Sequence, residues 1–333
     1  MNENILKVDD LCKTYRTARG DVSALDGISL EIQRGEVLGL VGESGCGKST
    51  LAKALMRLIE VDRGSIELDG VDLLTLRGEE LRSQRHRFQM IFQDPFASLN
   101  PRQRVSSILE APLVVHKRGA ASERRDRVDW LMKKVGLRPE MADRLPHEFS
   151  GGQRQRIGIA RAIALNPEFI ICDEPVSALD VSVRAQVMNL LADLRKEFSL
   201  SYLFISHDLS IIRHIADRVA VMYLGRLVEV GSPKKIFSAP SHPYTRALLD
   251  SFPAPDPSKA ATKNRQVLRG EVPSPINPPS GCRFHPRCPI ATELCAREQP
   301  ELLPTAHGDF VACHFPLNGE SRLLTAAAAT PKS

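Results

Sequence analysis

The sequence predicts an α/β fold built on a largely parallel sheet. Short apolar runs that suit buried parallel strands occur at Val37–Val41, Phe169–Cys172 and Tyr202–Ile205. Amphipathic stretches with helical spacing lie between such runs, at Lys48–Ile59 and Ser182–Phe198. Alternation of strand and helix along a chain is typical of βαβ units, whose strands run parallel.

The length and composition predict one large domain followed by smaller parts. A chain of 333 residues is long enough for an α/β domain, expected at 1–251, with an arginine-rich helical insertion at about 96–150. Prolines are dense at 252–281, which predicts an extended linker. A module with four cysteines follows at 282–316, and 317–333 has no pattern that requires order.

The overall composition is that of a soluble globular protein, with 42% hydrophobic and 26% charged residues. The net charge of +5 is small for this length, so we expect no nucleic-acid partner. Residues 1–4 lack the pattern of a signal peptide. Apolar runs such as Val219–Leu224 are far shorter than the roughly 20 residues that span a bilayer. Any membrane role is therefore expected to be peripheral.

A phosphate-binding motif, G-x-x-x-x-G-K-[ST], lies between the first predicted strand and the first predicted helix, which is its usual context. Its glycines let backbone N–H groups converge on phosphates at a helix N-terminus. Lys48 should reach the β- and γ-phosphates, and Ser49 should bind Mg²⁺. We expect alkylation of Cys46 to inhibit the protein and ATP to protect it. The expected ATP-binding residues here are Gly42, Glu43, Ser44, Gly45, Cys46, Gly47, Lys48, Ser49 and Thr50.

Two acids, Asp173 and Glu174, directly follow the apolar run Phe169–Cys172. The carboxyl end of a strand in a parallel sheet faces the crevice where ligands bind. Asp173 is expected to hold Mg²⁺ and Glu174 to polarise the attacking water. Such a strand is common by itself, but together with the phosphate loop it predicts a site that hydrolyses a nucleoside triphosphate.

A second anion-binding loop precedes a predicted helix over Arg154–Leu165. Ser150 is a good N-cap, and the glycines after it expose backbone donors at the helix N-terminus. This loop has no lysine and no acid of its own, so we expect it to complete the phosphate site of another copy. Its residues are Ser150, Gly151, Gly152 and Gln153.

These features resemble the nucleotide-binding subunit of an ABC transporter over about residues 6–251. The resemblance implies that Ser150–Gln153 is the signature loop, which contacts the γ-phosphate held by the opposite subunit. It implies that Gln93 senses Mg²⁺ and the membrane partner, and that His207 is the switch histidine. Phe149 stands where the family usually has leucine, which exchanges one apolar side chain for another.

The same resemblance implies that Tyr15 stacks on adenine and that Asp180 ends the D-loop Ser177–Asp180. ATP would hold two subunits together, and hydrolysis would let them reopen. The expected catalytic residues are Glu174, His207 and Gln93, and the expected Mg²⁺ ligands are Ser49, Gln93 and Asp173.

The cysteine module contains four thiols within a short stretch, and neither a zinc-ribbon knuckle nor a ferredoxin run is present. Four soft ligands suit zinc or a [4Fe–4S] cluster, and unliganded reduced cysteines are the alternative. No residue ties the module to phosphate chemistry, so its expected role is structural or regulatory. The thiols are Cys282, Cys288, Cys295 and Cys313.

A narrower resemblance rests on Ser98–Arg102, His242–Thr245 and Gly281–Pro289, together with Cys313. These segments are similar to the ATPases of dipeptide/oligopeptide importers, especially the F-type subunit of a dipeptide permease. The resemblance implies a [4Fe–4S] cluster, with zinc as the alternative. It also implies a heterodimer with a sister ATPase, two transmembrane permease subunits and a solute-binding protein, at the cytoplasmic face of the inner membrane.

Peptide import has several alternatives. Related importers serve nickel, glutathione or oligosaccharides, and the solute is chosen by other subunits. An ABC ATPase that acts on DNA or ribosomes usually has tandem cassettes, long coiled coils or several zinc modules. A sugar-importer ATPase would need a longer, strand-rich C-terminus. A regulator that senses redox state through the cysteines is neither supported nor excluded by the sequence.

Overall fold

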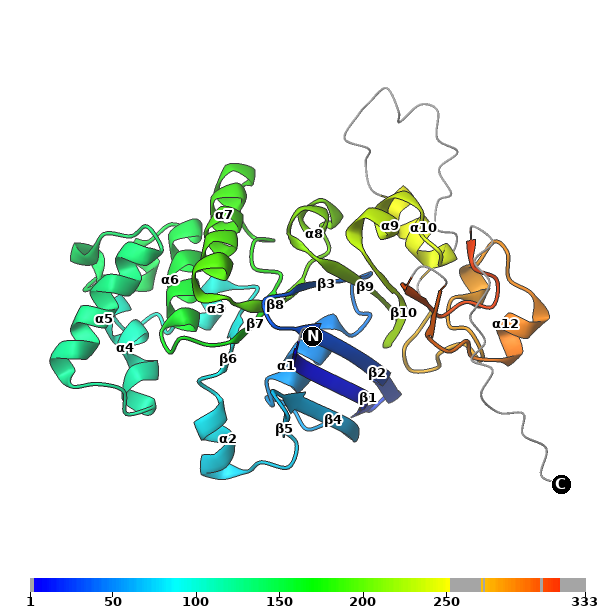
Figure 1. The fold of residues 1–333 in the computed structure, drawn as a ribbon, viewed down its shortest axis with the longest axis horizontal. Helices are drawn as coiled ribbons and strands as arrows, with labels where there is room; N and C mark the ends of the chain where they lie inside the picture. Colours follow the sequence, from blue (N-terminus) through cyan, green and yellow to red (C-terminus); the bar gives the residue numbers. More distant parts are fainter. Residues whose placement is uncertain (1–2, 252–270, 272, 306–307, 318–333) are drawn as a thin grey trace.

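The computed structural model describes residues 3–251, 271, 273–305 and 308–317 (Figure 1). Its strands form two sheets. They are β1 (Asn4–Thr17), β2 (Gly20–Gln33), β3 (Val37–Val41), β4 (Arg63–Leu68), β5 (Val71–Asp72), β6 (Phe88–Ile91), β7 (Phe169–Asp173), β8 (Ser201–Ile205), β9 (Arg218–Tyr223), β10 (Arg226–Gly231), β11 (Leu303–Pro304) and β12 (Phe310–Val311).

The larger sheet has the order β11-β12-β10-β9-β3-β8-β7-β6, and its central strands from β9 to β6 run parallel. Every residue of β3, β7 and β8 is buried, as expected of parallel strands covered on both faces. This confirms the three strands predicted from apolar runs. The smaller sheet, β2-β1-β4-β5, is antiparallel.

The side chains of β3 show how the core is divided. Val37 and Val41 belong to one buried cluster, which continues into the helices that cover one face of the sheet. Leu38 and Leu40 point the other way, into a cluster shared with the smaller sheet and the first helix. This alternation follows from the two-residue period of a strand, and it gives the molecule its layered arrangement.

The helices lie mainly between the strands, as the alternating pattern predicts. They are α1 (Lys48–Leu55), α2 (Gly78–Gln84), α3 (Pro95–Ser98), α4 (Val105–Val115), α5 (Ala121–Lys134), α6 (Gly151–Ile163), α7 (Val181–Phe198), α8 (Leu209–Ile215), α9 (Pro233–Ser238), α10 (Pro243–Asp250) and α12 (Glu293–Arg297). Single 3₁₀ turns occur at Pro139–Met141, Pro146–Glu148 and His285–Arg287.

One helix boundary differs from the one that the sequence predicts. Helix α1 was expected to reach Ile59, but it ends at Leu55 because Arg57 adopts a left-handed φ of 51°. The expected helical insertion is present as α3, α4 and α5, and these helices also pack against α6 (Figure 1). The helical layer is therefore continuous with the helix that follows the Ser150 loop.

The C-terminal part extends the core sheet. Strand β12 pairs antiparallel with β10, with Glu229 opposite Val311, and β11 pairs with β12. In Figure 1 this part lies at the end of the molecule opposite α4 and α5. Two-residue strands have no recognisable sequence pattern, so this pairing was not predicted. Residues 252–270 and 272 of the expected linker and 318–333 of the expected tail lie outside the described residues.

An aromatic cluster joins the cysteine module to the α/β domain. Phe284 is 1% exposed, and its ring centroid lies 5.4 Å from those of Tyr223 and Tyr244. Tyr223 and Tyr244 are themselves 4.5 Å apart. Edge-to-face contacts of this kind add to the burial of three large rings. The segment that carries the first cysteines is therefore held on the domain by its own core residue.

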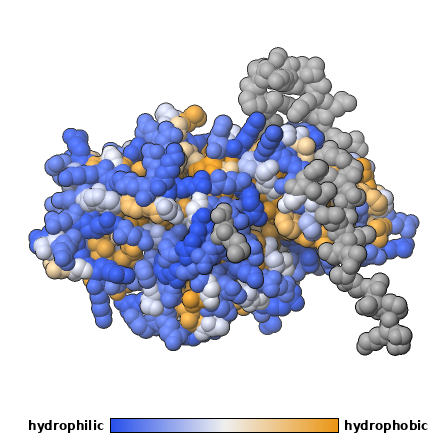
Figure 2. Space-filling view, in the orientation of Figure 1, coloured by the Kyte–Doolittle hydropathy of each residue, from blue (hydrophilic) through white to orange (hydrophobic). Residues whose placement is uncertain are grey.

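No helix within the described ranges is both long and apolar enough to cross a bilayer. On the face shown in Figure 2, apolar patches are separated by hydrophilic residues. This surface is typical of a globular protein whose apolar residues are scattered among polar ones.

Replacing Phe284 by alanine should lower the free energy of unfolding by about 3–5 kcal/mol, because it leaves a cavity among buried aromatic rings. Urea denaturation followed by circular dichroism measures the change. Leu294→Ala is the matched control, since Leu294 lies in the same module but is 39% exposed, and it should cost about 1 kcal/mol or less. Equal losses for the two variants would show that Phe284 is not a core residue.

Candidate active site

The phosphate loop runs from the end of β3 to the start of α1, and its path requires glycine at two positions. At Gly42 an added Cβ would lie 2.2 Å from the carbonyl oxygen of Met222, and at Gly47 it would lie 2.3 Å from that of Ala24. Both glycines also have positive φ, 157° and 109°. The loop is thus packed directly on the backbone of its neighbours.

Lys48 fills the centre of this loop. Its ammonium is 6% exposed and donates to the carbonyl oxygens of Gly42, at 2.8 Å, and Glu43, at 2.9 Å. A buried ammonium needs such acceptors. The loop therefore holds a positive charge ready for an anion, with the N-terminus of α1 beside it.

Ser49 and Asp173 come together from two different strand–loop connections. The Ser49 hydroxyl lies 3.4 Å from Oδ1 of Asp173 at the end of β7. Asp173 is 6% exposed, and this burial raises the pKa of its carboxyl above the usual value. The hydrogen bond from Ser49 and the charge of Lys48 oppose the increase without cancelling it. A hydroxyl next to a buried carboxylate provides hard oxygen ligands of the type that Mg²⁺ prefers.

The carboxylate of Glu174 contacts the other two residues predicted to be catalytic. Its Oε2 accepts a hydrogen bond from Nε2 of Gln93 at 3.0 Å and lies 3.0 Å from Nδ1 of His207. Glu174 has a left-handed φ of 47°, which is costly for a residue with a side chain. Its backbone N–H donates to Ile205 at the end of β8, which holds this conformation. The structure thus brings Gln93, Glu174 and His207 together, while their catalytic roles stay a prediction.

The second predicted anion-binding loop lies on α6 and forms a reciprocal cap. The hydroxyl of Ser150 accepts from the backbone of Gln153 at 3.3 Å, and the Gln153 side chain accepts from the backbone of Ser150 at 2.9 Å. Asp180 is exposed at the start of α7. Gly151 and Gly152 are the first two residues of α6.

Tyr15 lies in β1 of the smaller sheet, half-buried, with the Lys13 ammonium 5.5 Å from its ring centroid. Its ring is thus accessible for stacking, as its predicted role requires. Ser44 and Gly45 are exposed, while Thr50 is half-buried at the start of α1.

An unpredicted contact joins the phosphate loop to the cysteine module. Arg287 donates two hydrogen bonds to the carboxylate of Glu43, at 2.8 and 3.1 Å. The expectation that no residue ties the module to the phosphate chemistry is therefore wrong. Sequence patterns could not reveal this pair, because 244 positions separate its members.

The four clustered cysteines line one small pocket with apolar walls that include Phe284, Ile290 and Phe315. The seven cysteines, all within the described residues, form no disulfide. Burial raises the pKa of Cys313 to about 12, and the other three clustered thiols contribute to this increase. Within the part of the chain that the structure describes, no three or more Cys, His, Asp or Glu side chains are arranged to hold a metal ion. The pocket walls also include His242, whose pKa burial lowers to about 3.

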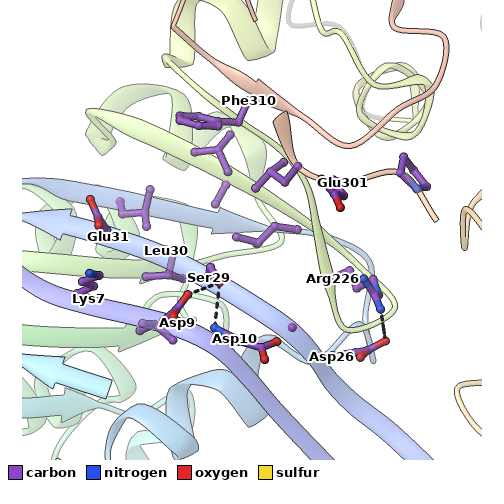
Figure 3. A pocket seen from close by; sticks show the side chains of 18 of the residues that line it. Lys7, Asp9, Asp10, Asp26, Ser29, Leu30, Glu31, Arg226, Glu301 and Phe310 are labelled. Carbon is purple, nitrogen blue, oxygen red and sulfur yellow. Dashed lines mark hydrogen bonds and ion pairs between the residues drawn. The ribbon is translucent and has the colours of Figure 1, made fainter. Parts of the chain in front are cut away.

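A larger cavity of about 730 Å³ opens between the smaller sheet and the C-terminal strands (Figure 3). Charged side chains from β1 and β2 line one wall, and Glu301 and Phe310 of the C-terminal part line another. Asp26 and Arg226 form an ion pair of 2.8 Å at its edge. No residue predicted to bind ATP lines this cavity.

The phosphate loop follows β3, and two acids follow the apolar part of β7, which is separated from β3 by β8 alone. Together with the loop from Ser150 to Gln153, these features are typical of an ATPase of the ABC type. A family model described as "ABC transporter" matches residues 25–177, and one described as "Oligopeptide/dipeptide transporter, C-terminal region" matches 228–295. The oligopeptide transport ATP-binding protein AppF of Bacillus subtilis is 52% identical over 321 residues, which cover 94% of this chain and 98% of that protein. The chain belongs to the ATP-binding subunits of oligopeptide/dipeptide ABC transporters.

Solved structures agree with this assignment. A dimer of the ATP-binding cassette MJ0796 in a post-hydrolysis state, bound to ADP and Pi, matches with a TM-score of 0.63 and 31% identity, covering 68% of this chain and 98% of that one. The cbiO1 protein of Clostridium perfringens, part of the cbiONQ transporter complex, matches with a TM-score of 0.63 and 32% identity, covering 71% and 92%.

Cys46, whose alkylation is expected to inhibit the protein, should react slowly with iodoacetamide. It is 4% exposed, and burial raises the pKa of its thiol. We expect labelling at pH 8 to be at least about tenfold slower than at the half-buried Cys12. Mass spectrometry of labelled peptides measures both rates, and urea should equalise them. Equal rates in the folded protein would contradict the buried position.

Proposed function

We propose that this chain binds and hydrolyses ATP and thereby powers the import of peptides through separate membrane subunits. The observation that carries the proposal is the convergence of Gln93 and His207 on Glu174, next to the phosphate loop. The peptide specificity is supported by the match to the oligopeptide/dipeptide C-terminal region and by the relative named as an oligopeptide transport protein.

The site residues divide the work between them. Lys48 and the loop amides would bind the β- and γ-phosphates, and Ser49, Asp173 and Gln93 would hold Mg²⁺. Mg²⁺ would neutralise part of the negative charge of the phosphates. Glu174 would orient and polarise the attacking water, while its two hydrogen-bond partners fix the direction of its carboxylate.

The site is completed by a second cassette. The loop from Ser150 to Gln153 is already capped, so its backbone donors are oriented before a nucleotide arrives. It would contact the γ-phosphate bound by the opposite subunit, with Asp180 beside it. The dimeric cassette among the similar structures supports this arrangement. The opposite subunit is proposed to be a sister ATPase.

A groove next to Gln93 offers a docking place for a membrane subunit. It has a volume of about 970 Å³ and lies between the α/β core and the helical layer. Its lining includes Phe92, which is 38% exposed, and Val115, which is 48% exposed. A partner helix seated there would touch Gln93 directly, so motion at the ATP site would reach two transmembrane permease subunits. In this arrangement the chain would lie at the cytoplasmic face of the inner membrane, and a solute-binding protein would deliver the peptide.

The four cysteines are proposed to hold a [4Fe–4S] cluster. Four thiols that form no disulfide line one pocket with apolar walls, which fits the donor set of such a cluster. A single zinc held by the same four sulfurs, at Zn–S distances of about 2.3 Å, is the alternative. A cluster would supply a cross-link between Cys282, Cys288, Cys295 and Cys313.

Substitution of Glu174 by glutamine should preserve ATP binding but lower ATP turnover at least about a hundredfold, because an amide cannot accept a proton from the attacking water. The variant should accumulate as an ATP-bound dimer, detectable by size-exclusion chromatography. Lys48→Ala should instead abolish binding of the γ-phosphate. Parental turnover by Glu174→Gln would exclude Glu174 as the base.

Protein purified without oxygen should contain about four irons and four sulfides and absorb near 400 nm. Metal and sulfide analysis with a visible spectrum measures this directly. Cys282→Ser should lose the absorption, while Cys172→Ser is the control, since Cys172 is buried in β7. One zinc without colour would contradict the cluster and leave the ATPase assignment unchanged.

A further inference from the structure

The segment from Cys282 to Cys288 contacts both the small cysteine pocket and the α/β domain. Its cysteines line the small pocket of the module. Three residues between them, Arg283, Phe284 and Arg287, contact the α/β domain instead. This segment is therefore a direct mechanical link between the cysteine pocket and the ATPase core.

Arg287 is the member of this segment that reaches the phosphate loop. Its two bonds to Glu43 have the fork geometry that arginine makes with a carboxylate, and it also donates to the hydroxyl of Tyr223 at 3.3 Å. The Arg287 side chain is 5% exposed and that of Glu43 is 20% exposed. A pair this shielded is weakly screened by salt, and removal of one partner leaves a charge without compensation.

Glu43 is held at all three of its polar groups. Its backbone N–H donates to the hydroxyl of Tyr244 at 2.9 Å, and its carbonyl accepts from the ammonium of Lys48. Its carboxylate accepts from Arg287. The position of Glu43, and with it the start of the phosphate loop, thus depends on residues from α10 and from the cysteine module.

A second route joins the same segment to the same loop. Arg283 donates to the carboxylate of Asp26, which also pairs with Arg226 (Figure 3). The backbone of Asp26 donates to Gly225, and Gly225 in turn donates to the carbonyl of Cys46 at 2.8 Å. Two residues of the phosphate loop, Glu43 and Cys46, are therefore connected to the segment between the first two cysteines.

We propose that Arg287 is a positioning residue for nucleotide binding, which neutralises Glu43 and holds the phosphate loop in its binding shape. Without Arg287, the Glu43 carboxylate stands uncompensated beside the phosphate site and repels the anionic nucleotide. The conformation of the cysteine-bearing segment then determines the affinity for ATP. This inference rests on the proposed ATPase function and adds a regulatory route to it.

The test is equilibrium binding of MgATP to the full chain by isothermal titration calorimetry. Arg287→Gln should weaken binding about tenfold, as expected for loss of a charge-assisted pair. The double variant Glu43→Gln/Arg287→Gln should recover affinity to within about threefold of the parent, because the uncompensated charge is gone. A purely structural role for Arg287 would not give this recovery.

Asp309→Asn is the matched control. It removes another ion pair that fixes the C-terminal part, 3.3 Å from Lys235 on α9, and should change MgATP affinity less than about twofold. Melting temperatures without nucleotide show that each variant is folded. Unchanged affinity in Arg287→Gln, or a double variant as weak as the single one, would overturn the inference. Failure of the parent to bind MgATP would instead contradict the proposed function itself.

Discussion

The groups predicted to act on the γ-phosphate bound by this chain's own phosphate loop all follow the carboxyl ends of parallel strands, and the arrangement of those strands is the constraint on which the site depends. The phosphate loop follows β3, His207 follows β8, the two acids end β7, and Gln93 follows β6. These four strands are consecutive neighbours in the sheet. Because parallel strands end at the same edge, residues more than a hundred positions apart are brought within hydrogen-bond distance.

Burial is what keeps this edge in place. All residues of β3, β7 and β8 are inaccessible to solvent, so their register cannot slip without exposing apolar side chains on both faces. The strained backbone of Glu174 is tolerated because the chain on either side of it is fixed: β7 precedes it, and its own N–H is bonded to Ile205. The stability of the sheet thus maintains a local conformation that an isolated loop would not adopt.

The sequence was sufficient to predict the parts of the fold and site that follow local patterns. Apolar runs located β3, β7 and β8, and the motif located the phosphate loop between β3 and α1. Family resemblance singled out Gln93, Glu174 and His207, and the structure places the three side chains within hydrogen-bond distance at Glu174. The sequence could not predict contacts between distant, individually unremarkable residues. Glu43 and Arg287 look like ordinary surface charges in the sequence, and the two residues of β12 are too few to show a strand pattern.

The pairing of β12 with β10 also has a consequence for the sheet as a surface. A strand edge with unpaired backbone groups is a template for association with other chains, and natural proteins cover or blunt such edges. Here β12 covers β10, and the strand beyond it, β11, is only two residues long and contains Pro304, which has no backbone N–H to donate. The C-terminal part therefore ends the sheet in a form that resists edge-to-edge aggregation. A fragment cut after β10 would lose that protection together with its last strands.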